Sequence, residues 1–166
     1  MTTDRVRTPD NLRAFVCSAS GGGDVPVVRF GFASLVGSWR IWRSIDDRYG
    51  RQCMTGKGNA HFEPAGADVL EYHERLNMRF AHRATPLAAT GSFVWRYDHP
   101  IVEVVSRDRL VVQRFDLLVD SHSYVHDCGP DRYEGRCDFS KWPDWTSSWD
   151  VVGPRKDYLM TTRFRR

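Results

Sequence analysis

The chain has 166 residues, of which 41% are hydrophobic and 27% charged; this is enough for one domain with one core, and it excludes wholesale disorder and low-complexity classes. The formal net charge is +3, spread along the chain apart from a C-terminal arginine cluster, so composition gives no reason to expect a nucleic-acid partner. No apolar run approaches the roughly 20 residues of a membrane helix, and residues 1–11 lack a secretory signal. We therefore expect an intracellular, cytoplasmic protein with no membrane partner.

Motif searches remove several chemical classes. The four cysteines are widely scattered, and no CxxC, GxGxxG, Walker, HExxH or GxSxG pattern occurs. The motif-defined nucleotide-binding, metalloprotease and hydrolase classes thereby lose their main support. We expect no metal site, and the sequence assigns no cofactor.

The first 34 residues are predicted to form an arm and an entry segment outside the main domain. Residues 1–24 are polar and end in the flexible run Gly21-Gly22-Gly23. Apolar residues in Val27–Val36 recur at roughly one helical turn, which predicts a short helix that leads into the first strand.

From Gly37 onward the hydrophobic period is two, and turn residues recur about every 8–12 positions, as in all-β sandwiches and barrels. The clearest strand is Asp68–Phe80. In chain order, the predicted strands cover residues 38–45, 58–62, 68–80, 90–97, 101–105, 110–117, 122–126, 133–139, 145–152 and 156–164. Because closing a sheet removes unpaired edges, we expect residues 35–166 to form a single antiparallel up-and-down β-barrel of about 8–10 strands, with a sandwich as the alternative.

The sequence Gly37-Ser38-Trp39 resembles the G-x-W opening of lipocalins and other calycins. In that family the tryptophan closes the barrel floor beneath an arginine or lysine of the last strand. The resemblance therefore implies a cation–π contact of Trp39 with either Arg163 or Arg165.

A second, longer pattern lies in the C-terminal part: the run from His126 to Gly135, three tryptophans, and Gly153-Pro154-Arg155-Lys156-Asp157-Tyr158. It resembles a family of small calycin-like proteins of unknown function, over roughly residues 35–166. The resemblance implies a barrel with an internal cavity and supplies no catalytic residue to carry over.

Glu74 is the most informative single residue, because alternation places its carboxylate on the same face as Tyr72. A buried carboxylate is costly unless it is paired. Glu74 is therefore either a ligand anchor or general acid/base, or a member of a buried pair with an inward arginine such as Arg96 or Arg114.

His122, Tyr124, His126 and Cys128 share one strand face. The two histidines would lie about 13 Å apart on an extended strand, too far for one zinc ion. His126 instead fixes the following turn or faces the cavity mouth.

The aromatic residues supply candidate walls for a pocket, although a purely structural role in the core stays open for each. The predicted ligand-binding residues are Tyr72, Glu74, Trp95, Arg96, His126, Tyr133, Trp145 and Trp149.

These observations predict a barrel that binds a small apolar or aromatic molecule. A barrel isomerase or cyclase that uses Glu74 with a cavity histidine or tyrosine is the second hypothesis, with Glu74 and His126 as candidate catalytic residues. Haem binding through His126 and a solid barrel that serves as an interaction module are the others.

Overall fold

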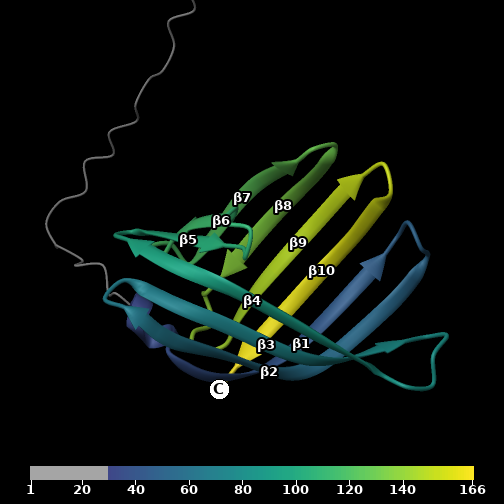
Figure 1. Ribbon diagram of the computed structural model, residues 1–166, viewed down its shortest axis with the longest axis horizontal. Coiled ribbons are helices and arrows are strands. Elements are labelled where there is room, and N and C mark those ends of the chain that lie inside the picture. Colours follow the sequence, from purple (N-terminus) through teal and green to yellow (C-terminus); the bar gives the residue numbers. More distant parts are fainter. Residues whose placement is uncertain (1–29) are drawn as a thin grey trace, which may run out of the picture.

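The computed structural model describes residues 30–166, and the sequence-predicted arm lies almost wholly outside them (Figure 1). Its division from the barrel at residue 34 therefore stays a prediction. In the entry segment, the described helical structure is a single 3-10 turn, η1 (Phe32–Leu35), shorter than the predicted helix. Gly37, with a φ of 112°, then turns the chain into the first strand, a conformation that favours glycine.

Ten strands follow η1, and each predicted strand corresponds to one of them. They are β1 (Gly37–Asp47), β2 (Gln52–Gly66), β3 (Val69–Phe80), β4 (Leu87–Asp98), β5 (Ile101–Val105), β6 (Val111–Asp116), β7 (Ser121–Cys128), β8 (Asp131–Asp138), β9 (Trp145–Gly153) and β10 (Lys156–Arg165). β2 extends beyond the predicted strand at both ends, and at its C-terminal end it continues through a bulge between Pro64 and Gly66, where the sequence indicated a turn.

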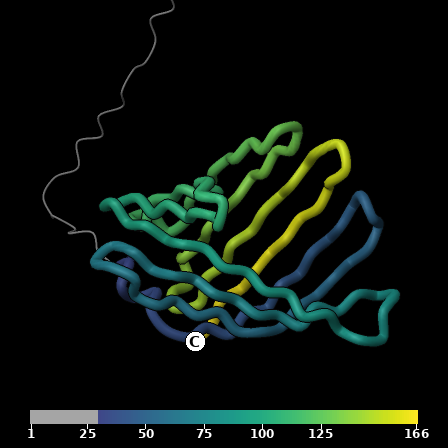
Figure 2. The backbone as a smooth tube through the Cα atoms, viewed as in Figure 1, coloured from purple at the N-terminus to yellow at the C-terminus, as the bar shows by residue number. Residues whose placement is uncertain are grey.

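All ten strands form one antiparallel sheet in the order β6-β5-β4-β3-β2-β1-β10-β9-β8-β7. Sequence neighbours pair throughout, and β1 pairs with β10, so the sheet curls into a nearly closed up-and-down barrel (Figure 2). The end strands β6 and β7 lie beside each other, but no hydrogen-bonded ladder joins them within residues 30–166. The predicted fold class is confirmed. No helix among residues 30–166 is long and apolar enough to cross a membrane.

The core fills one end of the barrel, near η1. Alternation directs large aromatic side chains inward there, and Trp39, Phe62, Phe115, Phe139 and Trp145 are almost completely buried. This aromatic floor stops part-way along the barrel, so the remaining interior is available for a cavity.

The predicted arginine contact with Trp39 is formed by a different residue. Arg163 and Arg165 are exposed on the outer face, whereas the guanidinium of Arg166 lies 4.6 Å from the Trp39 ring centre. The register explains the correction: Arg40 pairs with Arg165, so the next residue is the one that reaches Trp39 on the inner face. Arg166 also donates to the carbonyl oxygen of Val36, at 2.9 Å.

Candidate functional site

A cavity of about 430 Å³ occupies the barrel interior between the aromatic floor and the opposite end. Its lining residues come from β1, β3–β10 and the β5–β6 loop. They are Arg43, Tyr72, Glu74, Phe93, Trp95, Val104, Ser106, Asp108, Leu110, Val112, Gln113, His126, Cys128, Tyr133, Trp145, Ser147, Trp149, Tyr158, Met160, Thr162 and Phe164. The interior is therefore neither solid nor uniformly apolar.

A hydrogen-bonded polar cluster lies in the cavity wall. Arg43 on β1 forms a bidentate pair with Glu74 on β3, with nitrogen-to-oxygen distances of 2.8 and 2.7 Å. The Tyr72 hydroxyl donates to Glu74 at 2.6 Å, and Arg43 Nε donates to the Thr162 hydroxyl at 2.8 Å. Charge and hydrogen bonds are thus balanced inside the cluster, as a buried pair requires.

The strand between the two charged residues explains how they meet. β2 separates β1 from β3, and its inward positions opposite this region are Gly56, Gly58 and Ala60. These small residues leave room for the Arg43 side chain to cross β2 to Glu74. On the other side, Gly91 of β4 pairs with Glu74, and a Cβ at position 91 would lie only 2.9 Å from a Glu74 carboxylate oxygen.

Burial, together with the adjacent Glu74 carboxylate, raises the pKa of the Tyr72 hydroxyl well above its usual range. The phenol therefore stays protonated and acts as a donor to the carboxylate. Both carboxylate oxygens of Glu74 are already engaged, one by Arg43 and the other by Arg43 and Tyr72, so the side chain offers a ligand no free acceptor.

Aromatic rings continue from the floor into the cavity walls. Trp145 stacks on Phe164 with ring centres 3.7 Å apart and an interplanar angle of 4°. Trp149 meets Tyr133 edge to face at 6.0 Å, and Ser147 lines the cavity between the two tryptophans of β9. Such rings bury large apolar areas of a planar guest while their polar tips can donate hydrogen bonds.

The mouth of the cavity carries titratable groups. His126 and Cys128, near the end of β7, line it together with Tyr133 from the start of β8. Beside them, Lys156 Nζ donates to the Tyr133 hydroxyl at 2.8 Å and pairs with Asp131. Hydrogen bonds from Lys156 to Asp131 and Tyr133 raise the pKa of the ammonium, which therefore stays charged at neutral pH.

Seven of the eight predicted ligand-binding residues line this cavity: Tyr72, Glu74, Trp95, His126, Tyr133, Trp145 and Trp149. The predicted position of Arg96 was wrong, because strand alternation directs Trp95 inward and its neighbour Arg96 outward, where it is exposed. Arg114 likewise faces outward, 3.9 Å from Glu103. The partner of Glu74 is Arg43, which the sequence analysis missed although it shares the strand parity of the inward-facing Trp39 and Ile41.

Metal-ligating side chains do not gather into a cluster within the described residues. No group of three or more His, Cys, Asp or Glu side chains able to hold a metal occurs within residues 30–166. Cys128 is exposed and Cys137 is buried, and both are free thiols. Burial raises the pKa of the Cys137 thiol to about 12, so this cysteine is inert at neutral pH.

Two solved structures with low sequence identity are similar to this chain, and the first of them supports the barrel fold. The chain is similar to an S-type phycobiliprotein lyase from Guillardia theta, with 11% identity, coverage of 82% of this chain and 92% of that chain, and a TM-score of 0.50. It is also similar to a redesigned β-barrel bound to DFHBI, with 15% identity, coverage of 80% and 98%, and a TM-score of 0.46. None of the curated proteins compared with this chain matches it. The sequence model of DUF6314, a family of unknown function, matches residues 35–166.

Proposed function

Because this chain belongs to DUF6314, a family without an assigned activity, we propose its function from the cavity: it binds one small aromatic or otherwise apolar molecule inside the barrel. The observation that carries the proposal is the cavity of about 430 Å³, which combines aromatic walls with a few fixed polar groups. Small-molecule sites typically measure about 300–1,000 Å³ and have this composition.

The polar cluster supports recognition rather than catalysis. Arg43 and Glu74 neutralise each other, so this pair presents no net charge to a ligand in the cavity. The nearby hydroxyls of Ser147, Tyr158 and Thr162 can contact polar atoms of a guest whose remaining surface is apolar. A flat molecule with one or two hydrogen-bonding groups fits these walls best.

Titration with the neutral fluorophore N-phenyl-1-naphthylamine tests the proposal. We expect saturable 1:1 binding, an increase in probe fluorescence and quenching of the cavity tryptophans. Ser147→Phe, which places a ring in the cavity between Trp145 and Trp149, should weaken binding about tenfold or more, because the guest and the new ring compete for the same space.

The matched control is Ser148→Phe, because Ser148 lies next along β9 on the opposite face of the strand and lines no part of the cavity. This variant should bind the probe like the unmodified chain. Absence of saturable binding, or equal weakening by both variants, would contradict binding inside the barrel. A native mass spectrum of protein purified from its own cells, beside a denaturing spectrum, would reveal a co-purified ligand as extra mass.

The structure argues against two of the other sequence-based hypotheses, the barrel enzyme and the solid interaction module. The isomerase or cyclase hypothesis required an unpaired Glu74, and the bidentate Arg43 pair argues against it. The solid interaction module required a filled interior, and the cavity argues against that.

Haem binding is the second candidate function, because His126 lines the cavity and its ring makes no hydrogen bond with other described residues. A histidine that faces a cavity can serve as an axial ligand to haem iron. Haem titration should then produce a Soret band that His126→Ala abolishes. If no band appears, this candidate fails while the first proposal stands.

A further inference from the structure

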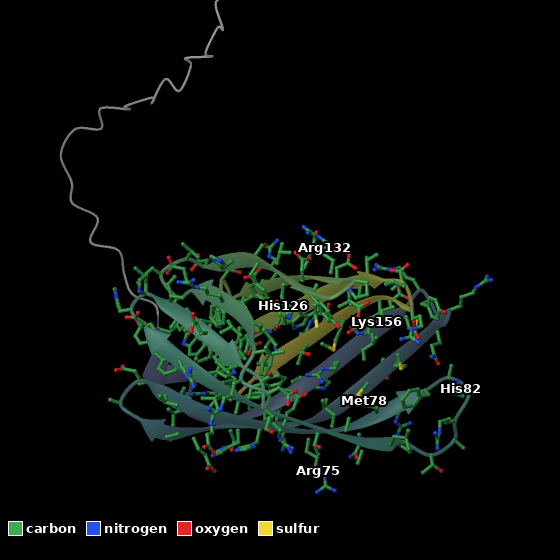
Figure 3. All side chains as sticks on the ribbon, turned by 45° about the horizontal axis from the view of Figure 1, so that its top comes forward. Arg75, Met78, His82, His126, Arg132 and Lys156 are labelled. Atoms are coloured by element: carbon green, nitrogen blue, oxygen red, sulfur yellow. The ribbon has the colours of Figure 1, made fainter. Side chains whose placement is uncertain are left out.

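The outer face of four adjacent strands gathers positive charge. Across β10, β1, β2 and β3, the register aligns three rows of outward-facing residues, here called the basic face. The rows are Thr161, Ser44, Thr55 and Arg79; then Arg163, Trp42, Lys57 and Asn77; then Arg165, Arg40, Asn59 and Arg75. Half of these twelve residues are cationic and none is acidic. Figure 3 shows Arg75 pointing away from the barrel.

Most cations of the basic face form no ion pair with an Asp or Glu side chain among the described residues. Arg165 pairs with Asp144 at 2.7 Å, and Arg40 donates to the main-chain oxygen of Arg166 at 3.4 Å. The five cations other than Arg165 form no ion pair with an Asp or Glu side chain within residues 30–166. Several cations elsewhere on the barrel do lie beside a carboxylate, among them Arg48, Arg114, Arg132, Arg136 and Lys156. The excess charge is therefore local, although the whole chain has a formal net charge of only +3.

We propose that the basic face binds the phosphate backbone of single-stranded nucleic acid without sequence preference. The cations and the interspersed serine, threonine and asparagine side chains are the groups that proteins use to contact phosphate and sugar oxygens. The face covers about 13 Å along the strands and about 14 Å across them, enough for several phosphates. This site is separate from the cavity and independent of the function proposed for it.

The shape and composition of the face favour a nucleic acid over a membrane. Surface-bound proteins commonly insert aromatic or aliphatic side chains beside their basic residues. On this face Trp42 is the one large apolar side chain, and the guanidinium of Arg40 lies over its ring at 5.9 Å. The outer wall of a barrel is convex, so a flexible single strand can follow it over more contacts than a straight duplex can.

The basic face cannot be recognised from the order of residues in the sequence. Four of the six cations, at positions 40, 57, 75 and 79, are separated along the chain from the two C-terminal ones, at 163 and 165, so the sequence predicts no nucleic-acid partner. The pairing of β1 with β10 brings the C-terminal arginines beside the N-terminal strands. The charge cluster exists only in the folded barrel.

Fluorescence anisotropy of a fluorescein-labelled dT20 oligonucleotide, measured with the full chain at 50 mM NaCl, tests the proposal. For five phosphate contacts we expect log K to fall with log salt at a slope of about −3.5, so that affinity drops about 100-fold between 50 and 200 mM. The double variant Lys57→Ser, Arg75→Ser should reduce the magnitude of this slope by about 1.4 and weaken binding about tenfold or more at 50 mM.

The control is Arg132→Ser, Arg136→Ser, which removes the same charge from exposed positions of β8. It should retain the affinity and salt slope of the unmodified chain. Three results would overturn the proposal: no binding of dT20 at 50 mM NaCl, equal weakening by both double variants, or binding to phosphatidylserine vesicles without binding to dT20. Unchanged thermal unfolding curves would establish that both variants fold.

Discussion

At the scale of single residues, the Arg43–Glu74 pair decides how the cavity can behave. The side chain of Glu74 is 7% exposed and that of Arg43 is 15% exposed, so both charges depend on each other and on their hydrogen bonds. A pair of this kind is costly to break, because the remaining partner keeps its charge in a poorly solvated position.

We therefore expect Glu74→Gln to lower the free energy of unfolding by about 3–5 kcal/mol, measured by urea denaturation. Replacing both residues, as Arg43→Met with Glu74→Leu, should restore much of that loss because no buried charge remains. Glu103→Gln is the control: its partner Arg114 is largely exposed, and such surface pairs contribute at most about 1 kcal/mol. A loss in Glu74→Gln no larger than in Glu103→Gln would refute the interpretation.

At the scale of elements, the packing of the β7–β8 hairpin requires a glycine at position 135, because an aromatic ring lies directly over it. Tyr124 of β7 pairs with Gly135 of β8, and a Cβ at position 135 would lie 1.9 Å from an atom of the tyrosine ring. Gly135→Ala should therefore destabilise the protein by about 1–3 kcal/mol, because the ring must leave its position against Trp149. In Gly66→Ala the new methyl meets its neighbour at an ordinary 3.6 Å, so its thermal unfolding midpoint should fall less. Equal midpoints would contradict the packing argument.

The open seam between β6 and β7 is the second feature at this scale. Both strands are paired on one side only, and several exposed apolar side chains lie along or between them, including Val111, Leu118 and Val125. In hydrogen–deuterium exchange, peptides from β6 and β7 should exchange about tenfold or more faster than peptides from β2 and β3, which are paired on both sides. Similar protection in all four strands would mean that the seam closes in solution.

At the scale of the whole molecule, the alternating hydrophobic pattern predicted most of the fold but only part of the candidate site. Period-two alternation placed Glu74 and Tyr72 on one inner face, and the structure agrees. The same alternation should have excluded Arg96, whose neighbour Trp95 is inward. The pairing of Glu74 with Arg43 could not be predicted from alternation alone. The Arg43 side chain crosses β2, so the contact depends on the sheet order and on the small residues Gly58 and Ala60.

Closure of the barrel was also predictable only in part. A tryptophan beneath a terminal cation was implied by the G-x-W resemblance, but the choice of cation needed the β1–β10 register. That register places Arg166 at the point where three parts of the chain meet: η1, the start of β1 and the end of β10. Arg166 contacts the Trp39 ring and the Val36 carbonyl, and Trp39 Nε1 donates to the Leu35 carbonyl at 2.8 Å.

Arg166 should therefore hold the floor of the barrel closed. We expect Arg166→Ala to lower the free energy of unfolding by about 1–2 kcal/mol, from the cation–π contact and the hydrogen bonds to the Ser34 and Val36 carbonyl oxygens, and the midpoint of thermal unfolding by about 2–8 °C. Arg163→Ala removes the same side chain from the outer face of β10, where it forms no ion pair within residues 30–166, and should shift the midpoint by less than about 1 °C. A midpoint in Arg166→Ala equal to that in Arg163→Ala would mean that the aromatic floor holds together without its terminal cation.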